Sequence, residues 1–557
     1  MKRLSYVALI ILGGICFPVL SHGDAYWVFF ADRGDLDVSA RIQAKRTSPD
    51  DPKNRGRRAR ILGPSRLFNE MDVTVYPPYV DDVASRVDRV RTVSRWFNAV
   101  TVDATPGSVD DLKGLPFVRA VEPVASFSRT VGPAQPSLAA PMRPEALSYG
   151  NSFDQISMVG VKGLHDLGYF GEGVMVGILD SGFDGLDHAA FDSLRVANSW
   201  DFIDRDDDIT GDDHGTEVLA IMGGIDHGSL IGQAPHATYI LARTEDRDTE
   251  LRVEEDYWIA GIEWADSLGA DIVNSSLGYN EFDDGFSYSY SDMDGRTART
   301  TIAADLAVDR GISVITSAGN EGDNEWYYIT SPADGFGVIA VGSVDRDKFV
   351  STFSSRGPTY DGRVKPDFVA LGEPVWTVDA SSSSSYRFVQ GTSFAAPSVS
   401  GAVALLLEVH PEWSPETVAD SLRAYATSIA PDSLAGYGVI DAYASSGLKV
   451  EDSVSDGFVV YDPYPQPIEF TDAANRLYFP MDVPDKALLK ITIYNFAGEN
   501  VRSFGGDIEP GSLRERGSAP SWDGTNHTGD DVSPGVYFYS IELAGYGTHT
   551  GKIAVMR

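Results

Sequence analysis

The stretch Gly391-Thr392-Ser393-Phe394-Ala395-Ala396-Pro397 continues into a run of small and apolar residues that ends at Leu407. This composition predicts a buried helix that begins at Ser393. A serine at such a helix N-terminus lies where free backbone N–H groups and the helix dipole favour developing negative charge. The position suits a nucleophile, but serine and threonine are also ordinary N-caps, so this stretch alone leaves both roles open.

Two stretches upstream favour the nucleophile. Asp180 ends a strand-like run that begins at Val174, and His214 opens a second predicted helix. Taken alone, Asp180 before Ser-Gly could be a turn residue, but Asp, then His, then Ser is the chain order of one known catalytic triad. Asp180-Ser181-Gly182, His214-Gly215-Thr216 and Gly391–Pro397 resemble the three signature motifs of the subtilisin-like serine peptidases.

The resemblance implies a role for each of these side chains. Ser393 needs a base to become nucleophilic, His214 has the intrinsic pKa to take its proton, and Asp180 would hold the imidazole. Asn320 matches the family's Ala-Gly-Asn motif and would donate to the oxyanion beside the Ser393 N–H. The alternative for Asn320 is a turn residue without a chemical role.

The same resemblance implies a substrate-binding edge. Ser276, Leu277 and Gly278 would pair with the substrate backbone as an added strand. These residues, with Ala318 and Gly319, would form the walls of the specificity pocket.

Two positions depart from the family pattern. Tyr279 replaces a common glycine and predicts a bulkier wall of the specificity pocket. Phe394 replaces a common, oxidisable methionine and predicts tolerance of peroxide.

Residues 147–447 alternate helical patterns with short apolar strands, which predicts an α/β fold with a parallel sheet covered by helices on both faces. The expected strands are 174–180, 238–242, 271–275, 312–317 and 338–344, and the expected helices are 256–268 and 297–309. Sites in such sheets lie at the carboxyl ends of strands, so Asp180, 274–278 and 317–320 should converge on one edge.

Residues 1–23 resemble a secretory signal peptide, with Lys2-Arg3, an apolar run and small residues before the cut. The protein is therefore expected to be secreted or associated with the cell surface. Its only cysteine, Cys16, lies in this segment, so no disulfide framework is expected. No later run is expected to span a membrane.

Residues 24–143 predict a small α+β unit with strands at 26–30, 96–102 and 117–124 and helices at 79–90 and 108–112. This layout resembles the inhibitory propeptide of subtilases, which implies a zymogen whose own propeptide is a partner in cis. Residues 41–100 carry 13 Lys and Arg against 7 Asp and Glu, whereas the whole chain has a net charge of −36. The basic segment could dock electrostatically, or it could be a solvated face with 55–60 as a loop. A linker is expected at 131–144.

The charge of −36 argues against nucleic acid or an anionic membrane as a partner. The chemistry requires no cofactor. Structural calcium stays open, with no ligands assigned. Asp204 and the run 206–208 could bind a metal or form a solvated acidic loop.

Residues 453–557 show short alternating strands with Gly and Pro between them, which predicts a β-sandwich. The segment resembles the C-terminal Ig-like sorting modules of exported bacterial proteins, including those of the type IX secretion system. Sorting or surface attachment through secretion machinery is the implied role, and a passive carbohydrate- or protein-binding module is the alternative.

Together these features predict a secreted serine endopeptidase that acts on proteins or peptides and is made as a propeptide-inhibited zymogen. A catalytically silent surface binding or adhesion protein on the same fold is the alternative from another class. Esterase or peptide-ligase activity at the same serine also stays open, because acyl transfer uses the same groups.

Overall fold

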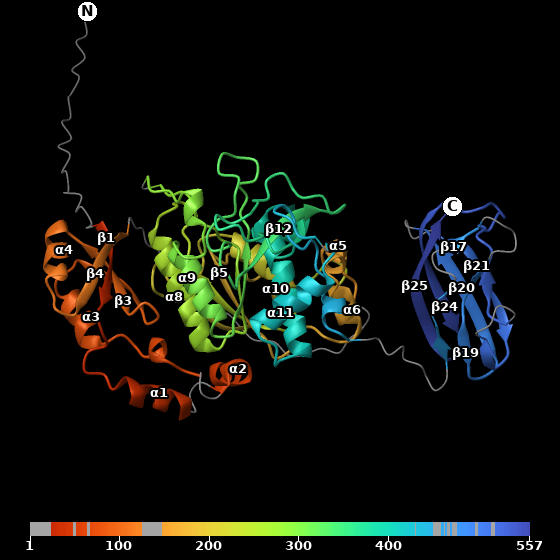
Figure 1. Ribbon diagram of the computed structural model, residues 1–557, viewed down its shortest axis with the longest axis horizontal. Coiled ribbons are helices and arrows are strands. Elements are labelled where there is room, and N and C mark those ends of the chain that lie inside the picture. The colour runs from red at the N-terminus through yellow and green to blue at the C-terminus, as the bar shows by residue number, and fades with distance from the viewer. Residues whose placement is uncertain are drawn as a thin grey trace, which may run out of the picture. The chain divides into compact units, whose positions relative to one another are not determined.

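The computed structural model describes residues 24–47, 52–63, 67–124, 147–283, 285–428, 430–448, 458–461, 463–464, 468–470, 476–495, 500–513 and 518–556. The chain divides into two compact units, Met1–Gly447 and Leu448–Arg557 (Figure 1). The predicted signal peptide, residues 1–23, and the predicted linker, 131–144, lie outside the described residues.

A seven-stranded parallel sheet forms the centre of the first unit, in the order β13-β12-β11-β10-β5-β9-β6. Its strands are β5 (Met175–Asp180), β6 (Arg195–Asp201), β9 (Thr238–Arg243), β10 (Ile272–Ser275), β11 (Ser313–Ser317), β12 (Ile339–Asp345) and β13 (Phe368–Glu373). The predicted parallel α/β sheet is confirmed. β6 and β13 were not predicted.

Two helix pairs cover this sheet: α7 (His214–Gly223) packs on α10 (Thr392–Val409), and α8 (Val253–Leu268) packs on α9 (Arg299–Val308) (Figure 1). The remaining helices of this part are α5 (Phe153–Met158), α6 (Val161–Asp166), α11 (Pro415–Tyr425) and α12 (Ala442–Ser445). Two short antiparallel pairs also occur, β7 (Ile225–Asp226) with β8 (Leu230–Ile231) and β14 (Val375–Val378) with β15 (Tyr386–Val389).

The helix α10 carries the stretch Gly391–Pro397 into the core, as predicted, with nearly every side chain from Thr392 to Leu407 buried. Within the part of the chain that the structure describes, it is also the one helix long and apolar enough to cross a membrane, against the expectation that no such run exists. Burial of 89% of it inside the unit identifies it as a core helix.

The N-terminal part of this unit is an antiparallel sheet in the order β2-β3-β1-β4, with β1 (Asp24–Phe30), β2 (Arg89–Ser94), β3 (Ala99–Ala104) and β4 (Val118–Val124). Val28 and Phe30 point to one face, where they pack in a core with α3 (Pro77–Ala84) and α4 (Pro106–Lys113). Trp27 and Phe29 point to the other face and join the core beside α8 and α9. Strand alternation thus gives this sheet two buried faces.

The prediction of a helix at 79–90 is wrong for the second half of that range. α3 ends at Ala84, and β2 begins at Arg89 because Val90 and Val93 pair with β3. The strand predicted at 96–102 begins only at Ala99, since Asn98 turns with a positive φ of 50°. Two further helices, α1 (Val38–Thr47) and α2 (Pro52–Leu62), were not predicted, and a short 3₁₀ turn, Glu70–Asp72, follows them.

The second unit is built from β-sheets, as predicted, and among its described residues every strand pair but one is antiparallel. One sheet has the order β17-β25-β24-β20-β21 and another β16-β19-β22, with a short pair β18-β23. Their strands are β16 (Val459–Val460), β17 (Ile468–Glu469), β18 (Leu477–Tyr478), β19 (Met481–Val483), β20 (Ala487–Tyr494), β21 (Asn500–Ile508), β22 (Gly511–Leu513), β23 (Ser521–Trp522), β24 (Gly535–Leu543) and β25 (Gly547–Met556). Trp522, Ile491 and Ile541 lie in their shared core.

Candidate active site

Asp180 and His214 form the first contact of the site. Asp180 is the last residue of β5 and is fully buried, and its Oδ1 lies 2.7 Å from Nδ1 of His214 at the start of α7. A Cβ at Gly215 would lie 2.9 Å from Cβ of Asp180 and would overlap the carbonyl of Gly182. Glycine after the histidine therefore lets α7 approach β5 closely enough for this hydrogen bond.

The electrostatics of this contact favour the imidazolium. Burial lowers the pKa of His214, but the charge and hydrogen bond of Asp180, with the charges of Asp212 and Glu217, outweigh it and raise the pKa to about 9. The pair therefore stabilises the cation that forms when the imidazole accepts a proton.

Ser393 is the second residue of α10 and is 9% exposed. Its hydroxyl donates to the carbonyl of Ser276 at 3.1 Å, while the Ser276 hydroxyl donates to the carbonyl of Ser393 at 2.7 Å. The ring of the next residue, Phe394, lies 5.3 Å from the His214 ring, centroid to centroid. The structure thus brings the serine, the histidine and the predicted substrate-binding edge into one place. The Ser393 hydroxyl is turned toward Ser276.

Asn320 follows β11 and is held by one residue. Its Oδ1 accepts from the backbone N–H and from the hydroxyl of Thr392, both at 2.9 Å. These bonds orient the amide so that Nδ2 points away from Thr392, and no described residue accepts from it. The N–H of Ser393 belongs to the first turn of α10, where backbone donors lack helical partners. The two donors together suit an oxyanion.

The predicted pocket walls lie beside Ser393. Ser317, at the end of β11, donates from its hydroxyl to the carbonyl of Leu277 at 3.4 Å, which joins the segment of Leu277 and Gly278 to that of Ala318 and Gly319.

Tyr279 does not add bulk to this wall, because its ring is fully buried and its hydroxyl donates to Glu245 at 2.9 Å. Thr330, a residue that no motif marked, lies against both walls instead.

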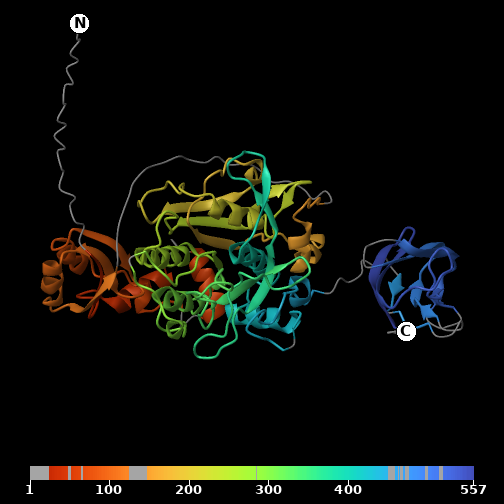
Figure 2. The ribbon, with the colours of Figure 1, turned by 90° about the horizontal axis from the view of Figure 1, so that it is seen from above.

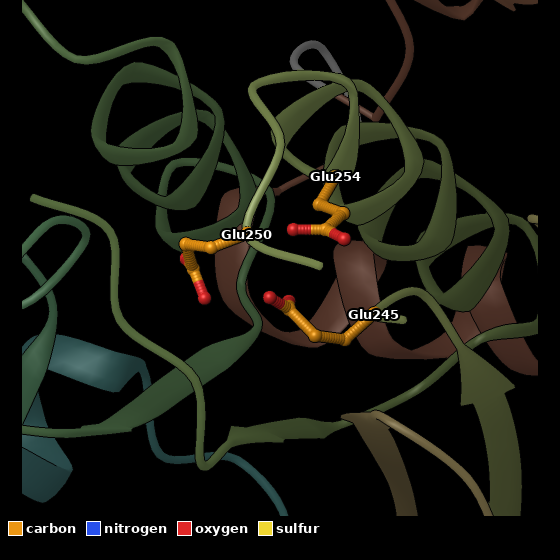
Figure 3. Close-up of side chains that lie close together, drawn as sticks. All are labelled: Glu245, Glu250 and Glu254. Atoms are coloured by element: carbon orange, nitrogen blue, oxygen red, sulfur yellow. The ribbon is translucent and has the colours of Figure 1, made fainter. Parts of the chain in front are cut away.

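Three carboxylates near the substrate-binding edge could hold a metal ion. One oxygen from each of Glu245, Glu250 and Glu254 lies within 4.8 Å of the others (Figure 3). Oxygens of this kind suit calcium. Burial raises the pKa of Glu245 well above its usual range, that of Glu250 to about 7 and that of Glu254 to about 8. Repulsion within the cluster adds to the effect of burial at Glu245 and Glu254, whereas at Glu250 the largest repelling charge is that of Asp283.

The cluster also has protein donors. The Tyr279 hydroxyl donates to Glu245, and the backbone N–H of Leu251 donates to Glu254 at 2.9 Å. The aspartates considered from sequence, Asp204 and 206–208, form no such group among the described residues, and Asp204 instead pairs with Arg243 at 3.3 Å.

Buried ion pairs join the N-terminal part of this unit to α8. Asp266 is fully buried and forms ion pairs with Arg57 at 2.5 Å, Arg58 at 2.7 Å and Arg95 at 2.9 Å. Figure 2 shows α2, which carries two of these arginines, beside the helices that cover the sheet. Burial raises the pKa of Asp266, but the three guanidinium groups outweigh it and hold the pKa well below its usual range. The solvated-loop alternative is therefore wrong for Arg57 and Arg58, each 1% exposed.

A further carboxylate of α8 extends this contact. Glu263 accepts hydrogen bonds from the Ser94 hydroxyl and from the Arg95 backbone N–H. Arg299 of α9 forms an ion pair with Glu122 of β4 and stacks over Trp27 of β1. The N-terminal sheet and its arm, the helices α1 and α2, are thus bound to α8 and α9 by charge as well as by apolar packing.

Comparisons with known proteins give two family matches and many relatives. Residues 171–438 match the family described as "Subtilase family", and residues 25–137 match "Peptidase S8 propeptide domain, Bacteroidota". Subtilisin from Bacillus pumilus is 31% identical over 296 residues, which cover 52% of this chain and 97% of that protein. Subtilisin E from Bacillus subtilis is 29% identical over 371 residues, 66% of this chain and 85% of that protein. A solved protease from Pseudoalteromonas arctica is 25% identical, with a TM-score of 0.44 over 54% of this chain and 99% of that one.

Proposed function

Because the chain belongs to the subtilase family of serine endopeptidases and carries the family's propeptide domain, we propose that it is exported as an inactive zymogen and hydrolyses peptide bonds with Ser393, His214 and Asp180. The observation that carries the proposal is the 2.7 Å contact between Asp180 and His214 beside a serine at a helix N-terminus. This arrangement supplies a base, its orienting acid and a nucleophile.

The reaction follows from these groups. His214 takes the Ser393 proton through Nε2, while Asp180 keeps Nδ1 protonated and oriented. The serine oxygen attacks the carbonyl carbon, and the oxyanion receives hydrogen bonds from Nδ2 of Asn320 and the N–H of Ser393. The imidazolium returns the proton to the leaving amine, and water then hydrolyses the acyl-enzyme by the same steps.

Substrate binding would release the nucleophile. The Ser393 hydroxyl is bound to the carbonyl of Ser276 in the free site. A peptide added as a strand along 276–278 would donate its own N–H to this carbonyl. The hydroxyl would then be free to turn to His214, so that binding and activation of the serine are linked.

The N-terminal part would act as the inhibitor. It buries Trp27 and Phe29 against the core beside α8 and α9, and it places three arginines on Asp266. These contacts support a propeptide that stays bound to its own enzyme until it is cut. The signal-peptide pattern of residues 1–23 and the family match favour export, and the β-sandwich unit would serve sorting or surface attachment.

The alternative, a silent surface binding protein, is disfavoured by a particular observation. Two bonds from Thr392 hold Oδ1 of Asn320 and leave Nδ2 without an acceptor among the described residues, which supports the role of Asn320 as an oxyanion donor. A fold kept only for binding gives no physical reason for this arrangement.

Peptide hydrolysis by purified protein tests the proposal, after trypsin has removed the N-terminal part. Wild-type protein should cleave peptide p-nitroanilides, Ser393→Ala should not, and Asn320→Ala should lose about 100- to 1000-fold in kcat, a magnitude known from subtilisin itself. KM should change little, because the amide acts only on the oxyanion. Undiminished cleavage by Ser393→Ala would overturn the proposal.

A further inference from the structure

A cavity of about 930 Å³, here called the interface cavity, lies between the N-terminal part of the first unit and the subtilase part. The helix α1, the segment 72–75 and the strand β2 form one side of it, and β6 with the residues after it and α8 form the other. None of the described residues that line it belongs to the proposed catalytic site or to the predicted substrate-binding edge. Its volume suits a small organic ligand.

The walls of the interface cavity carry an excess of positive charge. Two carboxylates line it, but both are already engaged: Asp72 pairs with Arg58 at 2.8 Å, and Glu263 accepts from the backbone N–H of Arg95 at 3.1 Å. Five cationic side chains line the same cavity, namely Arg41, Lys45, Arg91, Arg95 and Arg205. The protein's own carboxylates therefore do not neutralise it.

Arg91 has a buried donor beside this cavity that nothing in the described chain satisfies. The residue is 9% exposed, and its Nε and Nη2 bind Asp103, each at 2.6 Å. Its Nη1 is buried and has no hydrogen-bond partner among the described residues. Buried donors are normally paired, so an unpaired one on a cavity wall marks a place where the acceptor of a ligand can bind.

Two further arginines of the cavity lack a counter-charge. Arg41 and Arg205 form no ion pair with any described residue, and Arg205 donates from Nη2 to the carbonyl of Val90 at 2.7 Å. Arg205 also has a positive φ of 65°, a conformation that is uncommon outside glycine. Partial burial lowers its pKa, and the charges of Arg89 and Arg91 lower it further. A negative charge in the cavity would offset this repulsion.

Aromatic rings supply the apolar part of the wall. Trp200, Phe202 and Trp264 line the cavity, and the rings of Phe202 and Trp264 meet edge to face with centroids 5.8 Å apart. Trp200 is 36% exposed although it is large and apolar. A flat apolar body can stack on these rings, whereas an inorganic anion gains nothing from them. The interface cavity therefore suits an anion that carries such a body.

We propose that the interface cavity binds a small organic anion with a flat apolar body, and that the bound anion holds the N-terminal part on the subtilase part. Both parts contribute contacts, so the anion binds the joined form and not the separated one. By linkage, a ligand at ten times its Kd favours the joined form about elevenfold. The binding site stands on the cavity alone, whereas its consequence, a delayed activation of the zymogen, rests on the proposed function.

Equilibrium dialysis of full-length Ser393→Ala protein with naphthalene-2-sulfonate tests the site. We expect one bound sulfonate per chain. Arg41→Gln combined with Arg205→Gln should weaken binding at least about tenfold, because charge-assisted hydrogen bonds are lost. Trp200→Ala, made separately, should weaken it to a similar extent, because the stacking surface is lost.

Matched controls separate charge, ring and position. Arg86→Gln and Phe349→Ala change exposed residues that do not line the cavity, and they should leave the affinity unchanged. Naphthalene-2-sulfonamide keeps the ring without the charge, and inorganic sulfate keeps the charge without the ring, so each should bind at least about tenfold more weakly than the sulfonate. No binding of the sulfonate, equal binding of the sulfonamide, or equal affinity in the cavity variants overturns the proposal.

Limited trypsin digestion of the same protein measures the holding effect. At ten times its Kd, the sulfonate should slow release of the N-terminal part up to about tenfold, and release from the Arg41→Gln, Arg205→Gln protein should not respond to the same concentration. Unchanged release at saturating sulfonate refutes the holding effect even where binding is observed. Every arm uses the inactive Ser393→Ala protein, so a failure of the proposed peptidase function would appear in peptide hydrolysis and not in these results.

Discussion

The acid–base behaviour of His214 determines the pH at which the proposed catalytic base is available. Burial alone would lower its pKa, whereas Asp180, at 2.7 Å, raises it to about 9 together with Asp212 and Glu217. A raised pKa keeps the imidazole protonated below this value and makes it a free base only above it. In the full chain the base form should therefore increase as the pH rises through about 9.

NMR titration of the imidazole nitrogens in full-length Ser393→Ala protein measures this directly. We expect a midpoint of about 9 for His214, and a clearly lower one in the Asp180→Asn, Ser393→Ala double variant, because the main raising charge is then gone. His165 gives an internal reference, since burial lowers its pKa to about 4 and it should stay neutral above pH 6. A His214 midpoint at or below 6.5 in Ser393→Ala would contradict the electrostatic account.

Residues with short, local signatures could be predicted from the sequence. Asp180, His214 and Ser393 each lie in a motif whose neighbours are small because two backbones meet there, as Gly215 shows. The position of Thr330 could not be predicted, because its spatial contact with Gly278 and Gly319 leaves no pattern in the sequence. Tyr279 was assigned to the wrong surface for the same reason, since only the fold shows its hydroxyl on Glu245.

At the scale of elements, a buried carboxylate of α8 holds the arm formed by α1 and α2, together with the ion pairs of Arg58 with Asp72 and of Lys53 with Asp271. Asp266 of α8 binds Arg57 and Arg58 of α2 and Arg95 beyond β2, and all of these contacts are buried or nearly so. Removing one partner of a buried ion pair leaves unpaired charge and typically costs about 3–5 kcal/mol. The arm should therefore loosen when this carboxylate is lost.

Limited trypsin digestion of full-length Ser393→Ala protein tests this dependence. Introducing Asp266→Asn should speed cleavage after Arg57 or Arg58 at least about tenfold, because the side chains become accessible. Asp82→Asn is the matched control, since Asp82 forms an exposed ion pair with Arg86 and should change little. Equal cleavage rates at Arg57 and Arg58 with and without Asp266 would show that the ion pairs do not hold the arm.

The elements that sequence patterns predicted best are those with an apolar face of their own, such as β5, α8 and α10. The prediction of a helix at 79–90 was wrong because pairing of Val90 and Val93 with β3 overrides the local pattern. The arm was missed because α2 is rich in arginine and buries charge on Asp266, which has no signature in apolar periodicity. Edge strand β6 was missed because its residues Arg195–Asp201 are mostly polar.

At the scale of the whole molecule, the two family matches fall on the two parts of the first unit. The "Peptidase S8 propeptide domain, Bacteroidota" match covers the N-terminal sheet and its arm, and the "Subtilase family" match covers the central parallel sheet. The charge difference seen in the sequence corresponds to a contact in space, because basic residues of the first part meet acidic residues of α8. Sequence and structure thus agree on a propeptide domain and a subtilase domain in one chain.

Fluorophosphonate labelling of the protein, after removal of the N-terminal part, tests the central claim most directly because the reagent reacts only with an activated serine. Mass spectrometry of the digested product should find a single label, on Ser393, that is absent in Ser393→Ala and forms far more slowly in His214→Ala. A folded wild-type protein that takes up no label, or carries it on another residue, would contradict the assignment of Ser393 as the nucleophile.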